Sequence, residues 1–236
     1  MHSQAMTSLG QRLVRVKKIK GIVFDLDGTL ADTFEDIASS VNHVRDTLGL
    51  PPLSLHEVKR HVGKGVSHLI QNTTGASDPR QLKEAVSVFR KFYLEHLLDS
   101  TRLYDGVMQG LDMLYSRSIS MAVLSNKPED ATKKIVEGLG IARFFMGVFG
   151  GDSFEKQKPA KESLLGALNA LKVDPWHALM VGDSLIDIET AENAGTICAI
   201  VTTGLLGDLD SVKGRVLLVA HDIFTLAKGL EHLNLI

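Results

Sequence analysis

The sequence is poor in cysteine and in long hydrophobic runs. Cys198 is the one cysteine among 236 residues, so no disulfide can form within the chain. This excludes a small secreted domain held together by disulfides and favours a reduced, cytoplasmic location. No apolar run approaches the roughly 18 uncharged residues that a membrane-spanning helix requires, so we expect no membrane partner. Hydrophobic residues still make up 44% of the chain, which is enough to bury a core.

Charge is nearly balanced in total but unevenly placed. Residues 1–20 carry five basic side chains and no acidic one, which leaves 21 basic against 28 acidic residues in the remainder. An acidic body argues against nucleic acid as a partner. The basic start is not a secretory signal, because no apolar segment follows it before Asp25. We interpret residues 1–18 as a basic N-terminal tail, with a mitochondrial presequence as an alternative.

Short apolar runs alternate with amphipathic segments along most of the chain. The runs are apolar at consecutive positions, which is typical of strands buried on both faces. Strand–helix repetition of this kind predicts an α/β fold: a doubly wound parallel sheet of five or six strands, covered by helices on both faces. The predicted strands are 22–24, 121–124, 146–149, 178–181, 197–201 and 216–219, and the predicted helices lie near 106–118, 129–139, 160–171 and 187–194.

One stretch, residues 33–104, interrupts this alternation and shows no convincing strand. Apolar residues spaced three and four apart run from Phe34 to Leu48 and again from Leu82 to Tyr93, which indicates two helix faces. Segments that contain proline separate these helices. We therefore predict an inserted α-helical cap at 33–104 and a Rossmann-like catalytic core made of 19–32 and 105–236.

Polar side chains stand where the predicted strands end. In an open parallel sheet the ligand site lies beyond the carboxyl ends of the strands, so these residues should converge. Several of them are carboxylates, which repel one another unless a cation lies among them. A hard divalent cation with oxygen ligands answers this need, and Mg²⁺ suits a site that also takes phosphate. The converging residues are Asp25, Asp27, Ser125, Asn126, Lys158 and Asp183.

The residue types suggest a chemistry. Asp25, held by a metal and by Lys158, can attack phosphorus as a nucleophile. Asp27 can protonate the leaving alkoxide and then deprotonate the water that hydrolyses the aspartyl-phosphate. Ser125 and Asn126 offer a hydroxyl and main-chain N–H groups to phosphoryl oxygens. Lys158 would neutralise charge on both the nucleophile and the phosphate.

Four motifs together resemble those of the haloacid dehalogenase superfamily. The segment 24–30 (FDLDGTL) resembles its first motif, 124–128 (LSNKP) its second, 158–159 (KP) its third and 182–187 (GDSLID) its fourth. Their order and spacing match across 20–205. The resemblance implies the same α/β core, with the helical insert as the family's cap.

The resemblance also implies roles for single residues. Asp25 is similar to the family's nucleophile and metal ligand, and Asp27 to its acid/base, whose backbone carbonyl also contacts the metal. Asp183 resembles the third protein ligand of Mg²⁺, and Asp187 acts on the metal through water or another group. An aspartate at position 27 fits phosphate-ester hydrolysis or phosphomutase activity, and it argues against dehalogenases and P-type ATPases.

Within the superfamily the closest likeness is to the phosphoglycolate phosphatases, which the segments 62–65, 125–128, 139–141 and 150–153 resemble. This implies Mg²⁺-dependent hydrolysis of a small phosphomonoester, with 2-phosphoglycolate as the leading substrate. The alternatives are a phosphomutase similar to beta-phosphoglucomutase and a phosphatase for another small ester, a nucleotide or pyrophosphate. A non-catalytic regulatory binding module is a further alternative. The sequence is compatible with a monomer or a homodimer.

Lys64 is the candidate for substrate specificity in the cap. It stands between Gly63 and Gly65. A loop of this kind could dip into the site and pair Lys64 with the part of the substrate that does not react, such as a carboxylate. The alternative is an exposed lysine on a glycine turn.

Overall fold

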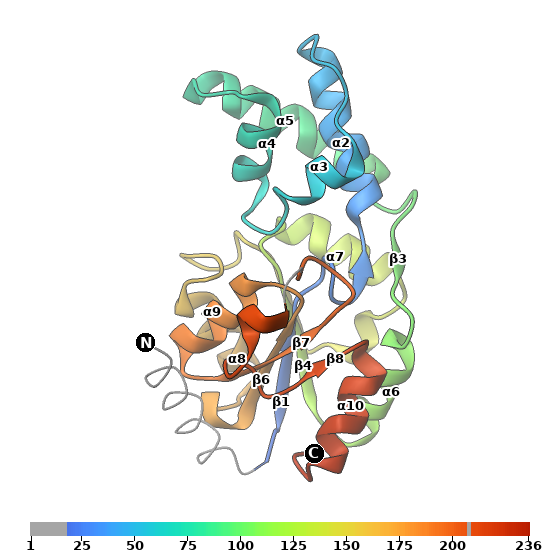
Figure 1. Cartoon of the computed structure of the whole chain (residues 1–236), viewed down its shortest axis with the longest axis vertical. Helices are drawn as coiled ribbons and strands as arrows, with labels where there is room; N and C mark the ends of the chain where they lie inside the picture. Colours follow the sequence, from blue (N-terminus) through green and yellow to red (C-terminus); the bar gives the residue numbers. More distant parts are fainter. Residues whose placement is uncertain (1–17, 207–208) are drawn as a thin grey trace.

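The computed structural model of the chain describes residues 18–206 and 209–236. The predicted tail at 1–18 therefore lies outside the described residues except for Lys18. A six-stranded, all-parallel sheet forms the core, with the strand order β5-β4-β1-β6-β7-β8 (Figure 1). The doubly wound α/β fold is confirmed. Its strands are β1 (Gly21–Phe24), β4 (Ser120–Leu124), β5 (Gly147–Phe149), β6 (Ala178–Gly182), β7 (Ile197–Val201) and β8 (Val219–Ala220).

Helices cover both faces of this sheet because successive strand residues point in opposite directions. Ile22 and Phe24 belong to one hydrophobic cluster and Val23 to the other. The first cluster includes buried residues of α6 (Val107–Ser116), α7 (Glu129–Gly138) and α10 (Ile223–His232); the second includes those of α8 (Lys161–Leu171) and α9 (Leu185–Ala194). Within the described ranges, no helix combines the length and the hydropathy needed to cross a bilayer.

The sequence prediction was wrong at several element ends. The strand expected at 216–219 is limited to Val219–Ala220, although Leu217 N still donates to Cys198 O of β7 at 2.7 Å. Met146 precedes β5 and is largely exposed. Helix α9 begins at Leu185 rather than 187, because Ser184 and Asp187 form a capping box at its start. Helix α10 was not predicted.

Four helices form a group beyond one edge of the sheet, at the top of Figure 1. They are α2 (Phe34–Thr47), α3 (Leu55–Lys59), α4 (Val66–Thr74) and α5 (Pro79–His96). The predicted apolar face of α2 is buried from Phe34 to Val44, but Leu48 lies beyond the helix end and is half exposed. Asp78 begins α5 by accepting hydrogen bonds from the N–H groups of Arg80 and Gln81, both at 3.0 Å. We call this group the cap.

Two short strands join the cap to the core. β2 (Ala31–Asp32) and β3 (Arg102–Leu103) pair antiparallel, so the expectation of no strand within 33–104 was wrong for β3. Beside them, buried Asp36 of α2 accepts hydrogen bonds from the N–H groups of Ser100, at 2.9 Å, and Thr101, at 2.9 Å. The two chain segments that cross between cap and core are therefore fastened to each other.

Candidate active site

The predicted polar residues meet at the carboxyl edge of the sheet. β1 lies between β4 and β6 in the strand order, so Asp25 stands at the centre of that edge. Ser125 follows β4, and Asp183 follows β6. Asp25 N continues the pairing by donating to Val181 O at 2.8 Å. The strand order therefore explains why residues 25, 125 and 183 are neighbours in space.

Three carboxylates form a cluster with the character of a metal site. Asp25, Asp183 and Asp187 each place an oxygen atom within 4.8 Å of the others. Burial, opposed by the charge of Lys158, raises the pKa of Asp25 to about 7. Burial and the charges of Asp187 and Asp25 also raise the pKa of Asp183 well above its usual value. Buried carboxylates that repel one another and offer hard oxygen donors fit a divalent cation such as Mg²⁺.

Asp183 is held firmly from several sides. Thr29 Oγ1 donates to Asp183 Oδ1 at 2.9 Å, and Leu205 N donates to Asp183 Oδ2 at 2.6 Å. Two glycines make room for this carboxylate, because a methyl group at Gly28 or Gly204 would lie under 3.0 Å from Asp183 Oδ2. Gly28 also has a φ of 85°, a conformation that favours glycine. The geometry fixes the Asp183 carboxylate before any ligand arrives.

Lys158 links Asp25 to Asp187. Its ammonium lies 3.0 Å from Asp25 Oδ2 and 2.7 Å from Asp187 Oδ1. Burial alone would lower the pKa of Lys158, but the charges of Asp187 and Asp25 outweigh burial and raise it. Ser184 Oγ donates to Asp187 Oδ2 at 2.7 Å, so both oxygens of Asp187 are engaged within the protein. Asp187 therefore orients Lys158 as well as contributing charge to the cluster.

Asp27 lies apart from the cluster and has its own cation, which the sequence analysis missed. Lys127 Nζ lies 2.7 Å from Asp27 Oδ1 and 2.5 Å from the hydroxyl of Tyr93 on α5. Thr33 Oγ1 donates to Asp27 Oδ1 at 2.6 Å. Burial would lower the pKa of Lys127, but Asp27 and Tyr93 raise it; burial raises the pKa of Tyr93 to about 12. One signal was available, since Lys127 stands inside the second motif.

Asn126 joins a cap loop to the carboxyl edge of the sheet. Its Nδ2 donates to Gly63 O of the cap and to Lys158 O, both at 2.9 Å. Its side-chain donor is therefore occupied, which leaves the main chain of Asn126 as the predicted phosphate contact. Ser125 is buried beside it, and Lys127 N donates to Ser125 Oγ at 3.3 Å. The roles of Ser125 and Asn126 in phosphate binding stay predictions.

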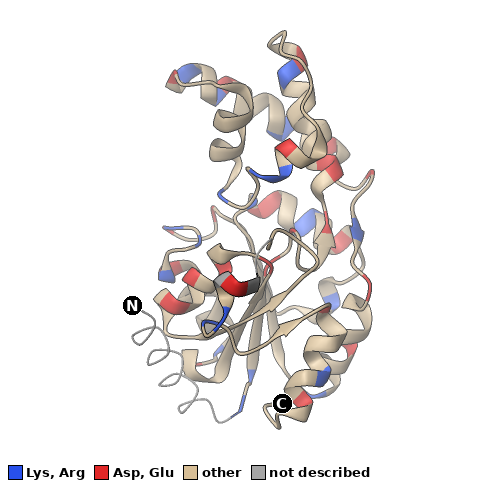
Figure 2. Ribbon diagram, in the orientation of Figure 1, with Lys and Arg blue, Asp and Glu red and all other residues tan. Residues whose placement is uncertain are grey.

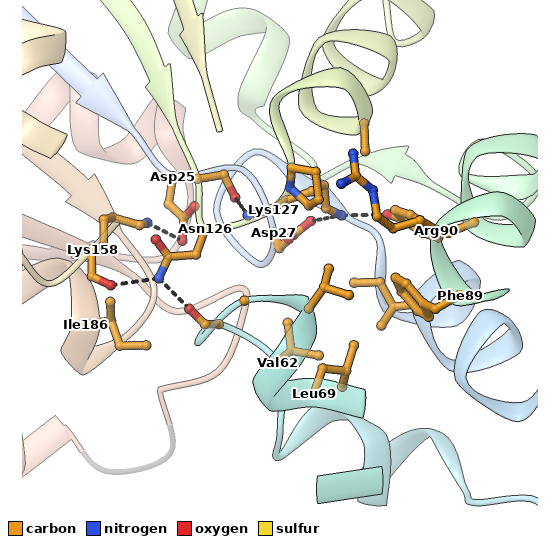
Figure 3. A pocket seen from close by; sticks show the side chains of 18 of the residues that line it. Asp25, Asp27, Val62, Leu69, Phe89, Arg90, Asn126, Lys127, Lys158 and Ile186 are labelled. Carbon is orange, nitrogen blue, oxygen red and sulfur yellow. Dashed lines mark hydrogen bonds and ion pairs between the residues drawn. The ribbon is translucent and has the colours of Figure 1, made fainter. Parts of the chain in front are cut away.

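Several of these side chains, but not Asp183 or Asp187, line a cavity of about 50 Å³ between cap and core (Figure 3). Asp25, Asp27, Asn126, Lys127 and Lys158 form its polar side. The cap contributes mainly apolar residues, including Val62, Leu69 and Phe89, and Ile186 of the core lies beside Lys158.

The structure does not bring Lys64 into this cavity. Gly63 and Gly65 line it, but the exposed Lys64 lines a shallower neighbouring depression. The Lys64 carbonyl accepts a hydrogen bond from Gln157 Nε2 at 3.1 Å. Arg90 of α5 instead lines the cavity from the cap, where it pairs with Asp130 of α7 at 3.2 Å.

Comparison with known proteins decides the family. The family model described as "Haloacid dehalogenase-like hydrolase" matches residues 22–201. The chain belongs to the haloacid dehalogenase-like hydrolases. A phosphoglycolate phosphatase of Chromobacterium violaceum is 35% identical over 196 residues, which cover 81% of this chain and 87% of that protein. A phosphoglycolate phosphatase of Aquifex aeolicus is 37% identical over 183 residues, which cover 78% of this chain and 84% of that protein.

A solved structure agrees with these relatives. The crystal structure of a predicted phosphoglycolate phosphatase from Haemophilus somnus has a TM-score of 0.83 and 28% identity to this haloacid dehalogenase-like hydrolase. The similarity covers 90% of this chain and 98% of that chain. The predicted resemblance and the prediction of an enzyme of the phosphatase type are confirmed.

Proposed function

We propose that this chain is a Mg²⁺-dependent phosphomonoesterase that works through an aspartyl-phosphate on Asp25. The observation that carries the proposal is the constellation at the sheet edge. Asp25, Asp183 and Asp187 cluster within 4.8 Å, and Lys158 contacts Asp25. Asp27 stands two residues after Asp25 with a separate set of partners. Two carboxylates in different surroundings suit two different tasks, nucleophile and acid/base.

The reaction follows from these positions. An oxygen of Asp25 attacks phosphorus, and the bond from phosphorus to the leaving oxygen breaks. Asp27 donates a proton to that oxygen. Water then attacks the phosphorus, gives a proton to Asp27, and displaces Asp25 as a carboxylate. Lys158 stabilises the charge of the nucleophile and the phosphoryl oxygens in both steps.

Asp25 and Asp183 would hold Mg²⁺, with Asp187 beside them. When bound, the cation would offset the repulsion among the carboxylates and draw charge from the phosphoryl group. The predicted contact of the Asp27 backbone carbonyl with Mg²⁺ stays part of this proposal.

The leading substrate is 2-phosphoglycolate. The relatives named phosphoglycolate phosphatase support it, and so does the size of the cavity. A volume of about 50 Å³ has room for the centres of roughly four water molecules. With the cap in this position, a compact ester fits better than a nucleotide. We propose that Arg90, the cap's basic residue among the described lining residues, meets the substrate carboxylate in place of Lys64.

Several further properties remain part of the proposal. We expect a cytoplasmic enzyme whose partner is a small phosphate ester and which binds neither nucleic acid nor a membrane. Basic and acidic residues are both spread over cap and core (Figure 2), which is typical of a solvated surface. We also propose that the cap, 33–104, is a separate unit from the core, 19–32 and 105–236.

A phosphate-release screen tests this function. Purified protein with Mg²⁺ would be offered 2-phosphoglycolate, p-nitrophenyl phosphate, β-glucose 1-phosphate, a nucleoside monophosphate and pyrophosphate. We expect release from several esters, the highest kcat/KM for 2-phosphoglycolate, and loss of activity in excess chelator. Conversion of β-glucose 1-phosphate to its 6-isomer with little phosphate release would favour the phosphomutase instead. No turnover of any compound would favour a binding module.

A further inference from the structure

Lys127 makes a buried bridge between the core and the cap. Its ammonium contacts Asp27 Oδ1 at 2.7 Å on the core side and the Tyr93 hydroxyl at 2.5 Å on the cap side (Figure 3 shows Lys127 and Asp27). The Lys127 side chain is 5% exposed and that of Asp27 is 12% exposed. An ion pair removed from water in this way is far less screened than one on the surface. Its loss would leave Asp27 without its cation.

The packing around Tyr93 holds its hydroxyl beside Lys127. It is buried on α5, and its ring stacks on Phe89 with the ring centroids 5.3 Å apart. Lys127 Nζ also lies 4.8 Å from the centroid of the Tyr93 ring. The loop after β4 therefore holds the backbone end of the lysine, and Tyr93 of α5 contacts its ammonium end. The position of the ammonium is set by the fold.

The bridge acts on one oxygen of Asp27. Thr33 Oγ1 and Lys127 Nζ both contact Oδ1. Neither of these two contacts is made to Oδ2. Asp27 lines the cavity next to Asp25. Anchoring Oδ1 at two points therefore leaves Oδ2 as the oxygen that can exchange a proton with a leaving group.

We propose that Lys127, supported by the Tyr93 hydroxyl of the cap, is a positioning residue that holds Asp27 in register for proton transfer to the leaving group. The inference rests on the proposed phosphatase function. It assigns Lys127 to the acid/base rather than to phosphate binding, for which we propose Lys158, Ser125 and the main chain of Asn126. It also makes the alignment of Asp27 depend on the seating of α5, because half of the bridge belongs to the cap.

The test compares two substrates that differ in how much they need a protonated leaving group. Phenyl phosphate and p-nitrophenyl phosphate have similar shapes and lack a carboxylate, but p-nitrophenolate leaves far more readily. Lys127→Met keeps length and removes the cation. In the presence of Mg²⁺ we expect kcat/KM for phenyl phosphate to fall about 10- to 100-fold, and that for p-nitrophenyl phosphate much less. Tyr93→Phe, which removes the hydroxyl and keeps the ring, should shift the ratio in the same direction by a smaller factor.

A double-mutant cycle separates positioning from substrate binding. In an Asp27→Asn background there is no acid to position, so adding Lys127→Met should change neither kcat/KM further. Lys133→Met is the matched control, because Lys133 on α7 is half exposed and pairs with Glu129. It should leave the ratio of the two substrates at the wild-type value.

Three results would overturn the inference. Equal losses for both aryl phosphates in Lys127→Met, or a loss that persists in the Asp27→Asn background, would mean that Lys127 acts on the phosphate directly. If Lys127→Met fails to fold, Tyr93→Phe decides, and an unchanged substrate ratio there refutes the bridge. A wild-type protein that hydrolyses no phosphomonoester would refute the proposed function itself, which is a distinct outcome.

Discussion

A single methyl group at Gly204 should disable the proposed metal site. Gly204 packs against the Asp183 carboxylate, and a methyl group there would lie well under 3.0 Å from Asp183 Oδ2 and 2.7 Å from the Cα of Gly28. The backbone of Gly204 has no positive φ, so the effect of Gly204→Ala is steric. Backbone lies on one side of the new methyl and a carboxylate on the other, and the carboxylate is the group that can move. We expect Asp183 to leave its hydrogen bond with Leu205.

The magnitude follows from that displacement. Moving a group that orients a metal typically reduces metal affinity or activity about 10- to 100-fold. This corresponds to about 1.4–2.8 kcal/mol of lost stabilisation by Mg²⁺ at a fixed, saturating concentration. Overpacking should also destabilise the metal-free protein by about 1–2 kcal/mol, since the gain from fixing a glycine offsets part of the cost.

The assay is a Mg²⁺ titration followed by the midpoint of thermal unfolding, together with kcat/KM. Gly229→Ala is the matched control. Gly229 lies inside α10, and the nearest atom to a methyl group there is Leu218 Cδ2 at an ordinary 3.5 Å. It should bind Mg²⁺ like the wild type and gain stability from helix propensity. A Gly204→Ala protein with wild-type Mg²⁺ affinity and activity would refute the placement of Asp183 in the metal site.

Three further outcomes are expected. Arg90→Ala should lower kcat/KM for 2-phosphoglycolate about tenfold more than for p-nitrophenyl phosphate, and Lys64→Ala should change that ratio less; the reverse order would return specificity to Lys64. Asp36→Ala should lower the free energy of unfolding by about 2–4 kcal/mol in urea denaturation, because it leaves a buried N–H group and a partly buried one between cap and core without an acceptor, and a loss below about 0.5 kcal/mol would contradict this. In excess chelator, the free energy of unfolding should fall as pH rises from 5 to 8. Asp25 has a pKa of about 7 in the folded state, above its ordinary 3.8, so in this range the folded state binds a proton that the unfolded state does not. The stability that comes from this proton is lost as the pH rises through the folded-state pKa. Asp25→Asn should flatten that slope, and an equally steep slope in the variant would place the titration elsewhere.

The core of the site could be predicted because it depends on strand order alone. A polar residue that follows a parallel strand lies at the carboxyl edge of the sheet. Asp25, Ser125 and Asp183 follow β1, β4 and β6, which are neighbours in the sheet. The strand at 216–219 was overestimated for a related reason. An apolar run indicates burial, but it does not show how many of its residues pair with the neighbouring strand. In this segment, only Val219–Ala220 pair with β7 as a strand.

The cap side of the site could not be predicted in the same way. Tyr93 fits the apolar face of α5 by spacing, and nothing in that spacing reveals that its hydroxyl contacts Lys127 of the core. This depends on how α5 docks on the loop after β4. The glycines around Lys64 indicated a turn, yet the direction of the lysine side chain is set by the same docking, which places Gly63 O against Asn126. Contacts between cap and core leave no periodic pattern in the sequence of either one.

The central claim is that Asp25 carries the phosphoryl group during turnover. The direct measurement is mass spectrometry of wild-type protein that is acid-quenched within the first turnovers of p-nitrophenyl phosphate in Mg²⁺. The account predicts one added phosphoryl group on the peptide that contains Asp25, its removal by hydroxylamine as expected for an acyl phosphate, and its absence from Asp25→Asn. Phosphorylation at another residue, or hydrolysis at an undiminished rate by Asp25→Asn, would contradict the account.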